Sequence, residues 1–213
     1  IFLILALILT GCEAGSTAVE EATVTEEASV AAEGVAGGEQ EEAVPVSGGT
    51  LRMSMRKPHT LNPLLNEDVT VDGVLKLIFE PLFVLDEEQN IRPNLADGYL
   101  LSDDGKSVAV SLRNDAVWSD GTAVTADDMI FSLDTIKSAS AGSIYKSALT
   151  NVSGYHKTSS TTVIIEYGAP FGGCEYNLCF PLIPRHYYED NNTITSAHSM
   201  QPLGNGMFTF VDY

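Results

Sequence analysis

Basic residues are scarce in this sequence. Its 213 residues include 11 Lys and Arg against 29 Asp and Glu, and the formal net charge at pH 7 is −18. A protein that binds nucleic acid needs a positively charged face to neutralise phosphates. The shortage of bases therefore argues against nucleic acid as a partner.

Cysteine is also rare, with three residues in the whole chain. Cys174 and Cys179 have four residues between them. In an oxidising compartment they could form a local disulfide, and the alternative is two separate buried thiols. No second Cys or His pair stands at a metal-ligand spacing, and the four histidines form no H-E-x-x-H motif. We therefore expect no resident metal and no cofactor.

Long hydrophobic runs are absent except at the beginning. "IFLILALILTG" has eleven uncharged residues before Cys12, too few for a membrane-spanning helix but enough for the core of a signal peptide. There is no initiator Met and no basic leading segment, so we expect residues 1–12 to be the end of a truncated signal peptide. Leu9-Thr10-Gly11-Cys12 resembles a bacterial lipobox. This motif predicts that a lipid on Cys12 anchors the protein to the outer side of the bacterial cell membrane.

The next segment, residues 13–47, consists mainly of Ala, Glu, Val, Thr and Gly and has no Lys, Arg or aromatic residue. Such a composition cannot bury enough apolar surface to offset the entropy of ordering. We predict a disordered acidic tether there. Residues 48–213 are left to form one folded unit.

Local patterns predict several elements in this unit. Alternating apolar and polar residues predict strands over 51–56, 107–113 and 161–167. A further strand is predicted over 207–213. Apolar residues at 71, 74, 75, 78 and 79 predict a helix, and "SDDGK" at 102–106 predicts a hairpin turn. The mixture lacks a regular βαβ rhythm, which indicates an α/β (mixed α+β) class.

Three aspartates near the middle of the chain could be read as a catalytic group or as architecture. Asp120 lies in a Ser-Asp-Gly turn, and Thr125 with Asp128 has the spacing of a helix capping box. Asp127 would then lie in the first helical turn, where the helix dipole favours negative charge. We therefore predict that all three shape the backbone.

A fixed order of short motifs runs through residues 96–128. They are an Ala before an Asp-Gly turn, a strand ending in Leu-Arg, an aromatic residue before Asp-Gly, and a Thr-Ala-acid-Asp helix start. Here these are Ala96, Asp104-Gly105, Leu112-Arg113, Trp118, Asp120-Gly121 and Thr125-Ala126-Asp127-Asp128. The order resembles the family 5 extracellular solute-binding proteins of ABC importers, the peptide-binding group. The family more often has Gly-Thr-Gly-Pro-Tyr near the end of the region, so Asn205, Met207 and Phe208 are departures.

The resemblance implies a periplasmic-binding-protein-like type II fold, whose two lobes close around a ligand about a hinge. Within residues 48–213 it implies only the first lobe and its inserted subdomain. It further implies a monomeric, non-enzymatic protein that captures peptides and delivers them to an ABC permease. Nickel complexes, haem or oligosaccharides are alternative cargoes, and His59 keeps the metal alternative open.

Five ligand-binding residues follow from the resemblance. The loop residues Glu67, Asp68 and Val69 match a ligand-lining segment, Tyr145 matches a tyrosine that faces the cleft, and Asn205 lies near the hinge strand. Their structural alternatives are a solvated charged loop, a core aromatic residue and a turn residue, respectively.

Two further functions remain as alternatives. Ser143 and Lys146 have the S-x-x-K spacing of penicillin-interacting serine enzymes, although the companion motifs S-D-N and K-T-G are absent. A sensory or adhesive lipoprotein could also keep the fold without transporting a solute.

Overall fold

The computed structural model describes residues 50, 52, 54–138, 142–170, 172–189 and 197–212. Apart from Thr50, these residues belong to one compact unit, Leu51–Tyr213. The expected signal peptide, the lipidation site Cys12 and the tether at 13–47 lie outside the described residues. No helix among the described residues is long and apolar enough to cross a membrane.

The described elements include both helices and strands, which confirms the mixed α/β class. In chain order they are α1 (Val69–Ile78), β1 (Phe83–Leu85), β2 (Ile91–Pro93), β3 (Ala96–Leu101), β4 (Ser107–Leu112), α2 (Ala126–Lys137), β5 (Val152–Lys157), β6 (Thr162–Tyr167), the 3-10 helix η1 (Cys174–Leu178), α3 (Arg185–Tyr188) and the 3-10 helix η2 (Ala197–Met200).

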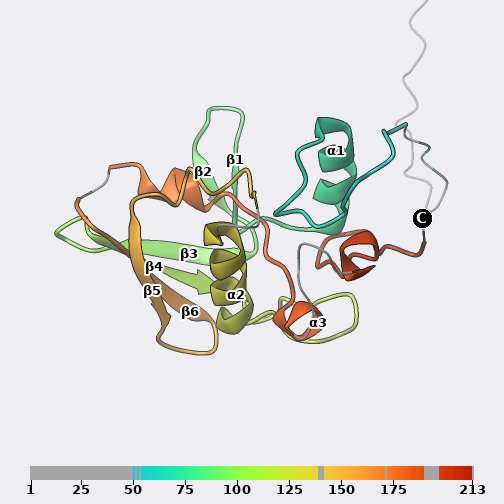
Figure 1. Ribbon diagram of the computed structural model, residues 1–213. Coiled ribbons are helices and arrows are strands. Elements are labelled where there is room, and N and C mark those ends of the chain that lie inside the picture. The colour runs from blue at the N-terminus through green and yellow to red at the C-terminus, as the bar shows by residue number, and fades with distance from the viewer. Residues whose placement is uncertain are drawn as a thin grey trace, which may run out of the picture. The chain divides into compact units, whose positions relative to one another are not determined.

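A four-stranded antiparallel sheet with the order β3-β4-β6-β5 is the largest element of the unit. Helix α2 packs against β5, β6 and α3, and Figure 1 shows it lying across the sheet. In β4, Val108, Val110 and Leu112 are buried, as the alternating pattern predicted, while their neighbours are partly exposed. This alternation places one face of the sheet in the core. Strands β1 and β2 form a separate antiparallel ribbon.

The predicted turn and cap are confirmed. In the β3–β4 hairpin, Gly105 has φ +65°, and the Ser102 hydroxyl donates to Asp104 Oδ1 at 2.7 Å. At the start of α2, the Thr125 N–H donates to Asp128 Oδ2 at 2.8 Å, which completes the capping box. Asp128 Oδ1 also accepts the Arg185 N–H at 2.7 Å, so the cap additionally holds α3.

The other two aspartates also have structural partners. Asp120 Oδ2 lies 2.9 Å from His186 Nε2, and Asp127 Oδ1 lies 2.6 Å from Lys157 Nζ. Burial raises the pKa of the Asp120 carboxyl, but hydrogen bonds from Thr122 and His186 outweigh burial and leave the pKa below its usual value. No group of three or more His, Cys, Asp or Glu able to hold a metal occurs among the described residues.

Two predicted strands do not appear among the residues that the structure describes. The described residues of 51–56 and of 207–213 belong to no strand. Alternation makes a strand favourable only where a neighbouring strand takes up its backbone hydrogen bonds, and neither segment has such a neighbour among the described residues. The opposite error occurs at β5, whose sequence "VSGYHK" has little alternation but pairs with β6 along its length.

Candidate functional site

Helix α1 is the element that brings the candidate ligand-binding residues together. Glu67, Asp68 and Val69 lie at its beginning, Tyr145 faces its middle, and Asn205 contacts its end. Three segments that are distant in sequence therefore meet along one ten-residue helix.

The beginning of α1 is capped by Asp68. Its Oδ1 accepts the Thr70 N–H at 2.8 Å and the Thr70 hydroxyl at 2.6 Å. Both hydrogen bonds lower the pKa of the Asp68 carboxyl, and the one from the Thr70 hydroxyl has the larger effect. The carboxyl is therefore ionised at neutral pH, next to the positive end of the helix dipole. Val69 is 84% exposed, and Glu67 is also exposed.

An open hollow of about 310 Å³ borders this cap. Its lining residues are Lys57, His59, Thr60, Leu65, Asn66, Glu67 and Asp68, all but Leu65 with polar or charged side chains. The structure therefore places His59 in the same hollow as Glu67 and Asp68.

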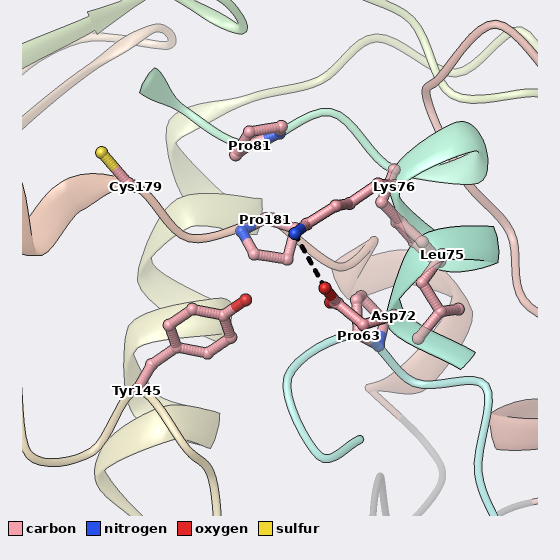
Figure 2. Close-up of a pocket in the computed structure, with 9 residues that line it drawn as sticks. Pro63, Asp72, Leu75, Lys76, Pro81, Tyr145, Cys179 and Pro181 are labelled. Carbon is pink, nitrogen blue, oxygen red and sulfur yellow. Dashed lines mark ion pairs between the residues drawn. The ribbon is translucent and has the colours of Figure 1, made fainter. Parts of the chain in front are cut away.

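A second, smaller cavity of about 70 Å³ lies beside the middle of α1 (Figure 2). Most of its wall is apolar, and the lining residues are Pro63, Asp72, Leu75, Lys76, Phe79, Pro81, Tyr145, Cys179 and Pro181. Figure 2 shows the Tyr145 hydroxyl and the Asp72–Lys76 pair directed to the same space between the prolines.

The polar groups of this cavity lie close together in a largely apolar wall. Asp72 Oδ2 and Lys76 Nζ are 2.8 Å apart, and the Lys76 side chain is 72% exposed. Burial, then the Asp72 carboxylate and Cys179, raise the pKa of Tyr145 to about 12. Its hydroxyl therefore keeps its proton at neutral pH and can donate or accept a hydrogen bond. The Tyr145 ring packs against Phe180, with ring centroids 6.3 Å apart.

Asn205 closes the other end of α1. The N–H groups of Asn205 and Gly206 donate to the Ile78 carbonyl at 3.1 and 2.8 Å, and Asn205 Oδ1 accepts the Glu80 N–H at 3.1 Å. Carbonyls at the end of a helix lack partners within the helix, and here a distant segment supplies them. A Cβ atom at Gly204 would lie 2.1 Å from the Ile78 oxygen, so this approach requires glycine.

Local sequence patterns do not single out Asp72, Lys76, the three prolines or, as a cavity residue, Cys179. The i, i+4 spacing of Asp72 and Lys76 could have predicted an ion pair on the surface of the helix. The prolines belong to three separate loops, and their convergence has no signature in the sequence.

The disulfide considered between Cys174 and Cys179 is not formed, and both thiols are free. Cys174 is buried at one end of η1, whereas Cys179 follows the other end and lines the small cavity. Burial raises the pKa of both thiols. The structure thus has the two separate thiols of the alternative interpretation.

The Ser143–Lys146 motif does not have the arrangement of an activated nucleophile. Lys146 Nζ donates to the Ser138 carbonyl at 3.1 Å, and Ser143 Oγ accepts the Tyr145 N–H at 3.3 Å. No hydrogen bond joins Ser143 Oγ to Lys146 Nζ in the part of the chain that the structure describes.

Known proteins resemble this unit in sequence. A family model described as bacterial extracellular solute-binding proteins, family 5 Middle, matches residues 90–213. The probable peptide-binding protein YejA of Agrobacterium fabrum is 38% identical over 96 residues, 44% of this chain and 16% of the relative. The probable peptide ABC transporter periplasmic-binding protein y4tO of Sinorhizobium fredii is 27% identical over 164 residues, 76% of this chain and 30% of the relative.

A solved structure extends the likeness to the fold. NikZ from Campylobacter jejuni, in complex with Ni(L-His), aligns with a TM-score of 0.68 and 28% identity over 74% of this chain and 32% of that chain. The expected likeness to type II periplasmic binding proteins is thereby confirmed for part of that fold. The chain spans about a third or less of the length of these relatives.

Proposed function

The chain belongs to the family 5 bacterial extracellular solute-binding proteins, and we propose that it captures peptides outside the cytoplasm and delivers them to an ABC permease. Two relatives are described as probable peptide-binding proteins, which supports peptides as the solute class. The observation that carries the proposal is the meeting of Glu67–Val69, Tyr145 and Asn205 along α1.

The chemistry along α1 suits a peptide main chain. A peptide presents alternating N–H donors and C=O acceptors, and a binding protein can hold these groups whatever the side chains are. The Asp72 carboxylate can accept an N–H, whereas Lys76 and the protonated Tyr145 can donate to a C=O. Lipid attachment at Cys12, an extracytoplasmic location and a monomeric state are parts of the same proposal.

Thermal unfolding of the complete protein, with its signal removed and Cys12 replaced, tests the proposal. A ligand that binds only the folded state raises the unfolding midpoint with its concentration. We expect di- to octapeptides to raise the midpoint, and we expect Tyr145→Phe to reduce the shift. Tyr176→Phe is the matched control, because Tyr176 is half exposed and does not line the cavity. Peptides that leave the midpoint unchanged would contradict the proposal.

Nickel complexes are a second candidate cargo. The observation in their favour is that His59 lines the open hollow beside the start of α1, since imidazole is a common nickel ligand. NikZ, a relative of known structure, was solved with Ni(L-His). Calorimetric titration with Ni²⁺ and L-histidine tests this candidate. Binding that His59→Gln abolishes and His156→Gln preserves would establish it in place of peptides.

A further inference from the structure

The small cavity beside α1 has a rigid wall. Pro81 and Pro181 form an isolated antiparallel bridge, and the Leu82 N–H donates to the Phe180 carbonyl at 3.0 Å. The Asn94 amide also donates to the Pro81 carbonyl at 3.1 Å. Proline has a fixed φ, so the part of the wall formed by Pro81 and Pro181 cannot widen without breaking these hydrogen bonds.

The floor of the cavity is equally constrained. Leu75 is 2% exposed and Phe79 is 1% exposed, and both belong to the hydrophobic core. Close-packed core residues resist displacement because any shift creates voids or clashes elsewhere. The floor of the cavity therefore keeps its position when a ligand enters.

That size limits what can enter. A cavity needs a volume of about 10–15 Å³ to hold a single water molecule, and a dry cavity of about 150 Å³ holds a benzene molecule. The cavity's volume of about 70 Å³ lies between these values. It can enclose a group of a few heavy atoms and is too small to enclose an aromatic ring.

Polarity limits the entering group further. Apart from Asp72, Lys76 and the Tyr145 hydroxyl, the side chains of the wall are apolar or weakly polar. A charged group buried against such a wall would lose its hydration without full compensation. The Asp72–Lys76 pair and the hydroxyl can instead bind the amide groups that flank a side chain.

We propose that this cavity is a side-chain pocket that selects a small aliphatic residue, in the range of alanine, valine and proline, at one position of the bound peptide. The inference rests on the proposed peptide-binding function and adds a tight specificity to it. The bound peptide lies with its main chain across Asp72, Lys76 and Tyr145. The selected side chain points at Leu75 and Phe79.

The test uses the complete protein and alanine pentapeptides in which each position in turn carries Gly, Val, Phe or Lys. We expect one position at which Phe and Lys weaken binding at least tenfold relative to Ala and Val, a typical effect of a mismatched apolar pocket. The other positions should tolerate all substitutions. Dissociation constants from calorimetry give the comparison.

A variant with a smaller pocket provides a second test. Cys179→Leu adds volume at the cavity wall, so it should weaken binding of the Val peptide about tenfold at the selected position and preserve binding of the Gly peptide. Val117→Leu is the matched control, since Val117 is 52% exposed and lies outside the cavity lining. The unfolding midpoint shows that each variant is folded.

The outcomes separate the two proposals. If no pentapeptide binds, the peptide-binding function fails, and the pocket assignment fails with it. If the peptides bind but every position tolerates Phe and Lys, the function stands and the pocket assignment is overturned. A Cys179→Leu variant that weakens the Gly and Val peptides equally would overturn it as well.

Discussion

The surroundings of α1 and of α2 use polar residues in opposite ways. Around α2, Asp120, Asp127 and Asp128 each bind a side chain or a backbone group of a neighbouring element. Around α1, the Asp72–Lys76 pair and the Tyr145 hydroxyl face a cavity. The dense acidic cluster is therefore architecture, whereas the candidate site is built from dispersed residues. A concentration of charge along the sequence did not mark the place where a ligand would bind.

The largest expected effect is on the closure of α1. Gly204→Ala would place a Cβ atom 2.1 Å from the Ile78 oxygen, so the segment 204–208 must move away from the helix end. We expect a loss of about 3 kcal/mol in the free energy of unfolding, at the upper end of overpacking costs. Urea denaturation measures this loss.

Gly98→Ala is the control for that change, because nothing lies within 4 Å of a Cβ atom at Gly98. It should change the free energy of unfolding by no more than about 0.5 kcal/mol, as is usual for substitutions away from special features. Equal losses at the two glycines would show that the contact with α1 is not tight.

Substitutions at the cap of α2 should lower the free energy of unfolding nearly as much. Asp128→Ala leaves the Thr125 and Arg185 N–H groups without their acceptor, which we expect to cost about 2 kcal/mol. Asp127→Ala removes only surface ion pairs, with Lys157 and Arg185, and should cost less than about 1 kcal/mol. Urea denaturation of both variants compares the two neighbours. If Asp127→Ala were the more damaging, the structural assignment of Asp128 would be wrong.

The free energy of unfolding at alkaline pH should depend on the burial of Tyr145. Its pKa is raised from 10.0 to about 12, so the folded state holds this proton more tightly than the unfolded state does. The resulting stability is fully present below pH 10 and is lost as the pH rises toward 12. In urea denaturation from pH 8 to 12, Tyr145→Phe should lose less stability than the wild type over this window. Parallel curves above pH 10 would contradict the burial of this hydroxyl.

The smallest expected stability effect is at the cavity itself. Asp72→Asn removes an i, i+4 ion pair whose lysine is mostly exposed, so the free energy of unfolding should fall by no more than about 0.5 kcal/mol. Peptide binding should weaken, because a neutral amide oxygen is a weaker acceptor than the Asp72 carboxylate. Asp86→Asn, which breaks a remote pair with Arg92, should leave binding unchanged. Calorimetry with both variants tells a binding role from a structural one.

Short-range patterns predicted much of this fold. The amphipathic spacing of α1, the alternation of β4, the Asp-Gly hairpin and the Thr125–Asp128 capping box all depend on contacts within a few residues. The order of such motifs also led to the family. The strands predicted at 51–56 and 207–213 were wrong for the described residues, and β5 was missed, because strand formation depends on a partner elsewhere in the chain.

The sequence by itself determined the turns, the caps, the amphipathic faces and the family resemblance, because each is encoded by neighbouring residues or by motif order. Tertiary structure alone decided that Pro63, Pro81 and Pro181 meet beside α1 and that Tyr145 faces Asp72. It also decided that Asn205 would complete the end of α1, 125 residues after Glu80. These contacts join distant segments whose approach is driven by burial of the shared core, and that driving force is non-directional and leaves no local pattern.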